Sequence, residues 1–347
     1  MDEPKAKVKP RLRWIHVLGA AILVLAAAGA WLNRATQPAK PGAAPFYMRL
    51  DRVRPLAAVL ADLDKQGVIR SYRAARILAL LSRTRTRLAI GTYRLGAGMN
   101  ANQVLTALEF PVHQMVRLPE HFWAARAARV LEKKDVCDAA DYVQAVHDPA
   151  AFSADLPFQV NAPSLEGYLY PDTYDLPPLL GASGVVERQL KAFDRKVYEP
   201  LGRPKDIGRI VTEASLIELE VDRDEERPLV ASVIENRLRK HMKLQIDASL
   251  NYGLGVWRPL RLSDYRKTKG PYNLYLHAGL PPGPICSPSL KSIEAAMSPA
   301  KTEFLYYVAL PDGHSLFAKT YPEHQKNVAK RKAALARRAK ERGQVHL

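Results

Sequence analysis

The fold is decided by the stretch from Ile207 to Asp247, which reads IGRIVTEASLIELEVDRDEERPLVASVIENRLRKHMKLQID. Apolar residues in its first half recur every three or four positions, which predicts an amphipathic helix; they are Ile207, Ile210, Val211, Ala214, Ile217 and Val221. A second helix is predicted to begin near Glu225, because acidic residues in a first turn and a nearby proline favour a helix start. The stretch therefore predicts two consecutive helices joined by an acidic turn.

Several carboxylates lie in the first helix and at its end, namely Glu213, Glu218, Glu220, Asp222 and Asp224. On a helical wheel Glu218 falls in the apolar stripe, whereas Glu213 and Glu220 point to the opposite side. A carboxyl group in an apolar setting has a raised pKa and can serve as a general acid near neutral pH, so the wheel favours Glu218. Two other interpretations stay open: the acidic run is a solvated face, or Glu218 is paired with a buried arginine such as Arg237.

Strand and loop signals surround these helices. Gly279–Ile285 (GLPPGPI) is rich in glycine and proline, which predicts a rigid, shaped loop. Phe304–Leu310, Val112–Leu118 and Leu88–Tyr93 have the composition of strands. Because helical segments alternate with these short strands, we expect an α+β fold.

The N-terminal region contains an uncharged run from Trp14 to Leu32, WIHVLGAAILVLAAAGAWL. Its length is close to the ~20 residues that cross a bilayer core, and tryptophans at both ends favour the headgroup layer. Basic residues are concentrated before the run, so the positive-inside rule places the N-terminus in the cytoplasm. The alternative is a cleaved signal peptide, for which the apolar run is long. The proline-containing segment Asn33–Pro45 then reads as an extended tether.

Residues 46–110 are predicted to form a small unit with the order helix, helix, strand, helix. Gly67 is suited to end the first helix, and Ser71 is a suitable N-cap for the helix Tyr72–Leu81. This arrangement is similar to that of the LysM-like glycan-binding module.

The segment SLEGYLYPDTY, residues 164–174, contains three closely spaced tyrosines, Tyr168, Tyr170 and Tyr174. They could form an exposed platform for a sugar ring or be ordinary core and turn residues. The segment alone favours the second interpretation.

The formal net charge of +17 first suggests nucleic acid or an anionic surface. Much of this excess, however, lies in residues 1–13 and 319–347, so the body of the chain is only mildly basic. Nucleic-acid binding requires basic residues concentrated on a folded face, so we expect none. The tail from Lys326 to Arg342 alternates alanine with basic residues, which predicts a helix that is either solvated or in contact with anionic lipid.

The ordered motifs ASLIELE, ERPLVASVIENRL, LQIDASLNYGLG, YNLYLHAGLPPGPI and SLEGYLYPDTY together resemble the endolytic murein transglycosylases, the MltG (YceG-like) family. The resemblance extends over nearly the whole chain. It implies cleavage of the β-1,4 bond between N-acetylmuramic acid and N-acetylglucosamine in nascent peptidoglycan, leaving a 1,6-anhydro end. It further implies that one glutamate serves first as acid and then as base, and that no cofactor or metal is required.

The family's catalytic signature falls on Glu220, in conflict with the wheel. A helix that ends near Glu220 would turn this residue into the cleft, so we assign Glu220 as catalytic and keep Glu218 as the alternative. The resemblance further assigns substrate binding or positioning of the acid to polar residues around the groove, namely Asn236, Gln245, Asp247, Tyr252, Asn273 and Tyr275.

The resemblance also implies a location and partners. We expect a single-pass protein of the inner (cytoplasmic) membrane whose catalytic domain is extracytoplasmic, which acts on glycan strands, limits their length and meets peptidoglycan synthases. The predicted layout is a cytoplasmic tail (1–13), a transmembrane helix (14–32), a tether (33–45), a LysM-like module (46–110), a catalytic domain (111–327, core 205–327) and a basic tail (328–347). The alternative function is a non-catalytic glycan-binding scaffold that recruits synthases.

Overall fold

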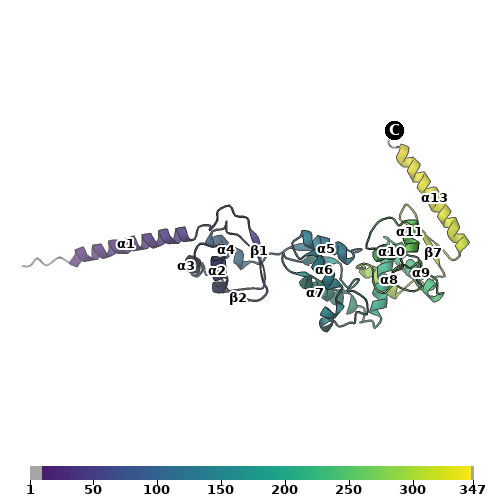
Figure 1. Ribbon diagram of the computed structural model, residues 1–347, viewed down its shortest axis with the longest axis horizontal. Coiled ribbons are helices and arrows are strands. Elements are labelled where there is room, and N and C mark those ends of the chain that lie inside the picture. The colour runs from purple at the N-terminus through teal and green to yellow at the C-terminus, as the bar shows by residue number, and fades with distance from the viewer. Residues whose placement is uncertain (1–9, 345–347) are drawn as a thin grey trace, which may run out of the picture. The chain divides into compact units, whose positions relative to one another are not determined.

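The computed structural model describes residues 10–344 and divides the chain into two compact units (Figure 1). Unit 1 consists of the chain up to His113 together with the short segment Pro177–Leu180, and unit 2 contains the remainder. Helices and two-stranded antiparallel sheets occur in both units, which places the protein in the predicted α+β class. The basic residues 1–9 of the predicted cytoplasmic tail and residues 345–347 of the basic tail lie outside the described residues.

The N-terminal helix α1 extends from Pro10 to Ala35. Its segment Trp14–Ala35 is long and apolar enough to cross a membrane, and the side chains of this segment are not buried inside the protein. The helix continues three residues beyond the predicted end at Leu32. An N-terminal apolar helix of this kind is consistent with a single-pass membrane anchor.

The segment after α1 is not the extended tether that its prolines suggest. It contains turns, and it is hydrogen-bonded to the small unit: the Lys40 amide donates to the carbonyl of Ala97 (2.8 Å), and the Arg70 side chain donates to the carbonyl of Pro38 (2.7 Å). These bonds hold the segment against unit 1.

The folded part of unit 1 contains three helices and four short strands. Their bounds are β1 Phe46–Leu50, β2 Arg54–Pro55, α2 Leu56–Lys65, α3 Tyr72–Leu81, β3 Arg87–Leu88, β4 Gly91–Leu95 and α4 Ala101–Glu109. The predicted strand Leu88–Tyr93 is instead two strands, because the chain changes partner there: β3 pairs with β2 and β4 pairs with β1.

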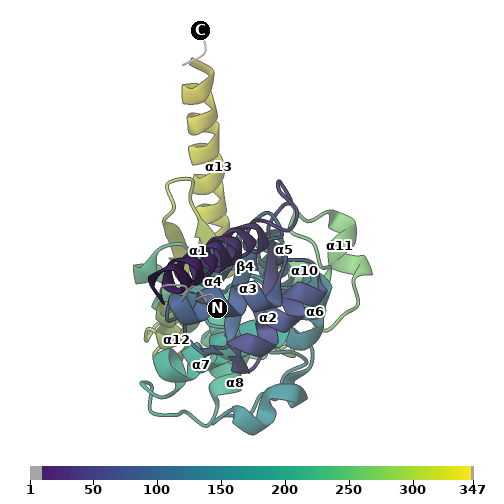
Figure 2. The same ribbon diagram turned by 90° about the vertical axis from the view of Figure 1, so that its left-hand side faces the viewer.

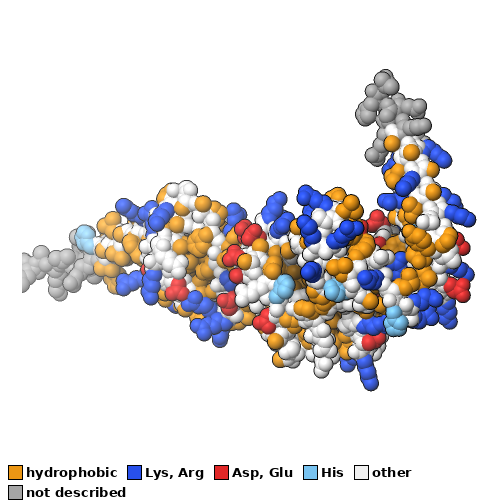
Figure 3. Space-filling model, turned by 45° about the vertical axis from the view of Figure 1, so that its right-hand side comes forward, with side chains coloured by type: hydrophobic (Ala, Val, Ile, Leu, Met, Phe, Trp, Pro, Cys, Tyr) orange, Lys and Arg blue, Asp and Glu red, His pale blue; other side chains and the backbone are white. Residues whose placement is uncertain are grey.

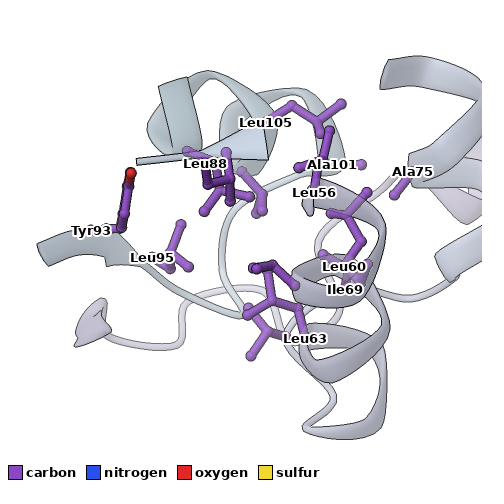
Figure 4. Packing of buried hydrophobic residues seen from close by; sticks show 14 of the residues in the cluster. Leu56, Leu60, Leu63, Ile69, Ala75, Leu88, Tyr93, Leu95, Ala101 and Leu105 are labelled. Carbon is purple, nitrogen blue, oxygen red and sulfur yellow. The ribbon is translucent and has the colours of Figure 1, made fainter. Parts of the chain in front are cut away.

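Local sequence signals account for the helix ends in unit 1. Ser71 caps α3 by accepting a hydrogen bond from the Ala74 amide, as predicted, and Gly67 follows α2 with a positive φ of 69°. Figure 4 shows how apolar side chains from the helices and from β3 and β4, among them Leu60, Leu88 and Leu105, pack into one buried cluster. Unit 1 therefore has a hydrophobic core of its own.

Unit 2 contains most of the helices. Its strands and α-helices are β5 Met115–Leu118, α5 Ala124–Lys133, α6 Ala139–Val146, β6 Asp172–Asp175, α7 Ala182–Phe193, α8 Ile207–Glu218, α9 Arg227–Arg239, α10 Asp247–Gly253, α11 Leu262–Lys267, α12 Leu290–Met297, β7 Tyr306–Ala309, β8 Ser315–Ala318 and α13 Tyr321–Gln344. In the sheets β5 pairs with β6 and β7 pairs with β8.

Helix α8 is the buried centre of unit 2. It packs against α9 and α12, and its side chains are buried almost continuously from Ile210 to Glu218. A helix that is enclosed on nearly every side has almost no solvent face, so a wheel drawn from its sequence cannot separate core from surface. This burial is the reason that the helical wheel gave the wrong position for Glu213.

The segment 164–174 belongs mainly to the core. Tyr168 is fully buried and its ring stacks on Phe158, while Tyr174 is 9 % exposed and donates to the carbonyl of Tyr170. Gly167 has a φ of 84°, and a Cβ there would come within 2.4 Å of Pro284 in the Gly279–Ile285 loop. The tyrosines therefore do not form an exposed platform, in agreement with the interpretation favoured from the sequence.

The basic tail forms the predicted helix, α13. Figure 3 shows Lys and Arg side chains along this exposed helix. Its first turn contacts β7, where His324 stacks on Tyr306.

Candidate active site

Helix α8 ends at Glu218, and this ending separates the two candidate glutamates. The last helical residue, Glu218, is held inside the protein with 1 % of its surface exposed. Glu220 follows in a turn, where its amide donates to the carbonyl of Ile217 (3.1 Å), and its side chain is only partly buried. The helix therefore ends just before Glu220, as expected from the resemblance.

Glu218 belongs to a buried network of hydrogen bonds. Its Oε2 accepts from Arg227 Nη1 (3.0 Å), from the amide and hydroxyl of Ser289 (3.0 and 2.6 Å), and from Ser292 Oγ (2.7 Å). The other oxygen, Oε1, lies 3.3 Å from Nε2 of His121. The network ties the end of α8 to the start of α9 and to α12.

The structure corrects two expectations drawn from the wheel. Glu218 does pair with a buried arginine, but the partner is Arg227, because a short connection brings the start of α9 to the end of α8. Glu213 was expected to point away from the core, yet it is 1 % exposed and lies beside Glu235. Burial, followed by the Glu235 carboxylate, raises the pKa of Glu213 to about 9.

Glu220 is held by a tyrosine from the β7 strand. The hydroxyl of Tyr307 donates to Oε2 of Glu220 over 2.6 Å. Burial raises the pKa of Glu220 to about 7, while the Tyr307 hydrogen bond and Arg237 lower it and the Asp247 carboxylate raises it. At neutral pH this carboxyl group therefore populates both protonation states.

Asp247 lies at the first position of α10 and accepts hydrogen bonds from two tyrosines. Tyr275 donates to its Oδ1 over 2.6 Å, and Tyr265 of α11 donates to the same atom over 3.2 Å. Burial and the hydrogen bond to Asp247 raise the pKa of Tyr275, so its hydroxyl stays protonated as a donor. The structure thus brings together Glu220, Asp247 and Tyr275 among the residues predicted from the sequence.

Asn273, a further residue predicted from the sequence, supports the residues around Asp247. The buried Asn273 accepts from the Tyr275 amide (3.0 Å) and donates to the carbonyls of Tyr265 and Thr268 (3.0 and 2.7 Å). It therefore holds both tyrosines that reach Asp247.

Asn236 has a similar supporting position on α9. It is buried, and its Nδ2 donates to the carbonyls of Thr302 and Phe304, both at 2.9 Å. These carbonyls belong to the segment that leads into β7, so Asn236 fixes the strand that carries Tyr307.

The remaining predicted residues, Gln245 and Tyr252, form no hydrogen bond with Glu220 within residues 10–344. The side chain of Gln245 is exposed, and in the described part of the chain only its amide makes a hydrogen bond, to the carbonyl of Leu274 (3.1 Å). Tyr252 lies at the far end of α10 among other aromatic rings.

The sequence alone did not single out Tyr307 or Tyr265 as members of this site, and it offered Arg237 as a buried partner of Glu218 rather than as a neighbour of Glu220. Arg237 donates to the carbonyls of Leu305 and Leu244, both at 2.7 Å, and thereby joins the β7 strand to the segment before α10. One signal was available: adjacent residues of a strand face opposite sides, so Tyr306 and Tyr307 had to point to opposite faces of the predicted strand.

The arrangement suits proton transfer at one carboxyl group. Glu220 has a pKa near neutrality, one hydroxyl donor in Tyr307, and the Asp247 carboxylate close enough to raise that pKa. Between residues 10 and 344, no cluster of three or more His, Cys, Asp or Glu side chains could hold a metal ion.

Comparison with known proteins gives the family. The model of the YceG-like family matches residues 49–330, which include both the site and most of unit 1. The chain belongs to the YceG-like family.

Two relatives of this chain are named endolytic murein transglycosylases. The protein of Bacillus subtilis strain 168 is 36 % identical over 167 residues, 47 % of this chain and 46 % of the relative. The protein of Streptococcus pneumoniae strain D39 is 28 % identical over 304 residues, 78 % of this chain and 54 % of the relative. The chain thus spans about half the length of these curated relatives.

A crystal structure of a YceG-like protein from Listeria monocytogenes is similar to this chain, with a TM-score of 0.57 and 28 % identity. The similarity covers 82 % of this chain and 99 % of that one.

Proposed function

We propose that this protein is a membrane-anchored endolytic lytic transglycosylase that cleaves the β-1,4 bond between N-acetylmuramic acid and N-acetylglucosamine in nascent glycan strands. The observation that carries the proposal is Glu220, a partly buried carboxyl group with a pKa of about 7 beside Tyr307 and Asp247. The names of the relatives agree with this activity.

In the first step Glu220 is the general acid. Because Tyr307 engages Oε2, we assign proton donation to Oε1. The proton passes to the glycosidic oxygen, which leaves on the N-acetylglucosamine side as the bond to C1 of N-acetylmuramic acid breaks. The Glu220 carboxylate then faces the developing positive charge on the sugar ring.

In the second step the same carboxylate is the general base. It takes the proton of the 6-hydroxyl of N-acetylmuramic acid, and the 6-oxygen bonds to C1 to give the 1,6-anhydro end. Ordinary glycosidases use a second carboxylate to direct water or to act as nucleophile. Here the attacking group belongs to the substrate, so one glutamate suffices and no metal or cofactor takes part.

The surrounding residues have supporting roles in this proposal. Asp247, with Tyr275 and Tyr265 as its donors, keeps the pKa of Glu220 high and orients the sugar at the site. Gln245 and Tyr252 contact the strand further along, whereas Asn236 and Asn273 position β7 and Tyr275.

We further propose that α1 spans the cytoplasmic membrane once, with the N-terminus in the cytoplasm and residues 111–327 as an extracytoplasmic catalytic domain. Residues 46–110 would serve as a LysM-like glycan-binding module, for which the separate core of unit 1 is suited. A protein so placed meets strands as synthases produce them and limits their length.

The direct test is product analysis with purified uncrosslinked glycan strands. Wild-type protein is expected to release fragments with 1,6-anhydro ends, detected by mass, and Glu220→Gln to lose this activity by about 10²–10⁴-fold or more. An active Glu220→Gln protein would refute the assignment of the acid. Strand binding by wild-type protein without any anhydro product would instead support the alternative, a non-catalytic scaffold that recruits synthases.

A further inference from the structure

A group of aromatic side chains in unit 2 has no part in the proton transfers. Trp123 lies edge-on to two rings, Trp257 (centroids 5.2 Å apart) and Tyr252 (6.1 Å), and Tyr252 also packs against Tyr272 (4.9 Å). We refer to these four residues as the aromatic cluster. None of the four hydrogen-bonds to Glu220 or Asp247 in the described chain.

Two chain segments carry both the aromatic cluster and the polar site. Helix α10 has Asp247 at its start and Tyr252 near its end, about 7–8 Å along the helix axis. The segment from Tyr272 to Tyr275 likewise contributes its first residue to the cluster and its last to the polar site. The cluster therefore adjoins the polar site, at a distance suited to a neighbouring sugar of one strand.

The two segments are packed tightly against each other. A Cβ at Gly253 would lie 2.9 Å from the Cβ of Tyr272, so a glycine at this position allows the close approach. Ser249 also donates to the carbonyl of Tyr272 over 2.8 Å. The spacing between cluster and polar site is thus fixed by the contacts of Gly253 and Ser249 with Tyr272.

Trp257 is presented to solvent on a loop that is itself held in place. Half of its surface is exposed, although tryptophan is a residue that proteins usually bury to a large extent. The next residue, Arg258, makes a bidentate ion pair with Asp264 of α11 (2.8 and 3.2 Å). Helix α11 lies at the edge of unit 2 (Figure 2). The ion pair thus fixes the loop that places the exposed Trp257 ring beside Trp123.

We propose that Trp257 and Trp123, with Tyr252 and Tyr272, form a stacking subsite for a sugar ring of the glycan strand next to the bond that is cleaved. A pyranose ring exposes C–H bonds on its faces, which pack favourably against an aromatic face, while its hydroxyl and amide groups stay at the edge. The inference rests on the proposed function for the identity of the strand. In this proposal the subsite binds the strand, and Glu220 carries out the proton transfers.

The distribution of tryptophans allows a direct measurement. The chain has four, of which Trp14 and Trp31 lie in α1, so a change in emission on strand binding reports on Trp123 and Trp257. Full-length Glu220→Gln protein in detergent is titrated with soluble uncrosslinked glycan strands, which it does not consume. We expect a saturable change in tryptophan emission.

Variants at Trp257 decide the proposal, with affinity also measured by strand pull-down. Trp257→Ala is expected to weaken binding about three- to tenfold, the range of one aromatic contact, and Trp257→Phe to keep most of the affinity. Leu262→Ala is the matched control. It removes a different exposed apolar side chain, at the start of α11 (87 % exposed), and is expected to bind as its parent.

The failure of each proposal has its own signature. Unchanged affinity in a folded Trp257→Ala protein would overturn the subsite, even if wild-type protein produces anhydro ends. Trp257-dependent binding by a wild-type protein that produces no anhydro ends would instead overturn the enzymatic activity and leave the subsite standing.

Discussion

The surroundings of Glu218 and Glu220 differ although one residue separates them. Glu218 is enclosed and accepts hydrogen bonds from Arg227, Ser289 and Ser292, so its carboxylate is engaged in holding three helices together. Glu220 lies beyond the helix end, where Tyr307 is its hydrogen-bond donor and burial raises its pKa to about 7. The number and charge of the donors around each carboxyl group thus differ, and this difference supports the proposal that Glu220 and not Glu218 transfers the proton.

Raised pKa values alone do not identify the site. Burial raises the pKa of Glu166 to about 8 and that of Glu213 to about 9, yet neither residue is among the groups around Glu220. Oε2 of Glu166 accepts from the Ala124 amide at the start of α5, which is a capping role. The distinguishing feature of Glu220 is its position beside Asp247 and Tyr275.

The largest expected effect is on stability at Glu218. Glu218→Gln removes the buried counter-charge of Arg227 and leaves this arginine, among the described residues, only its ion pair with the more exposed Asp224 (3.1 Å), which is expected to cost at most about 3–5 kcal/mol of the free energy of unfolding. Chemical denaturation measures this loss. Glu220→Gln is the matched variant, and at pH above 7 we expect it to be neutral or slightly stabilising.

The direction in which Glu220 changes stability with pH follows from its raised pKa. Between the unfolded value near 4.5 and the folded value of about 7, the native state binds more protons than the unfolded state, so Glu220 lowers stability as pH rises through this window. Equal destabilisation by Glu218→Gln and Glu220→Gln would contradict the inference that the surroundings of the two glutamates differ in their contribution to stability.

A smaller loss of stability is expected for Ser292→Ala. This change removes one donor to the Glu218 carboxylate (2.7 Å) and one acceptor of Arg227, without changing the shape of the buried side chain much. Hydrogen bonds to charged groups contribute about 1.5–3 kcal/mol, and denaturation of purified protein should show a loss in this range. Cleavage by the folded protein should remain, whereas loss of cleavage without loss of stability would assign Glu218 a catalytic role.

Tyr307→Phe is expected to act on the pH profile more than on stability. The Tyr307 hydrogen bond favours the charged form of Glu220, so its removal raises the pKa of Glu220 further. At high pH the initial rate of anhydro-end formation falls because Glu220 loses its proton. In the Tyr307→Phe protein this alkaline limb of the pH–rate profile should lie at higher pH. An unchanged pH–rate profile would show that Tyr307 does not influence the proton transfer.

Asp247→Asn is expected to give the smallest shift, in the opposite direction. The Asp247 carboxylate raises the pKa of Glu220, so a neutral amide lets that pKa fall and moves the alkaline limb to lower pH. The same rate measurements check this, with Tyr307→Phe as the counterpart. A shift in the same direction for both variants would show that these neighbours do not set the pKa as inferred.

The sequence by itself determined the elements that depend on neighbouring residues. Helix α9 begins beside Pro228, α3 is capped by Ser71, and Gly279–Ile285 forms a loop, because capping and backbone restrictions act within a few residues. The end of α8 just before Glu220 was anticipated from the ordered motifs of the family rather than from the helical wheel. Composition and spacing likewise indicated the apolar helix α1.

Only the tertiary structure decided which side chains meet. The pairing of Glu218 with Arg227, the burial of Glu213 and the contact of Tyr307 with Glu220 join residues from different helices and a strand. The wheel had no information on these contacts because α8 is enclosed on nearly every side. The pKa of a carboxyl group depends on desolvation and on the donors and charges around it, and the packed fold, not the chain's local pattern, supplies both.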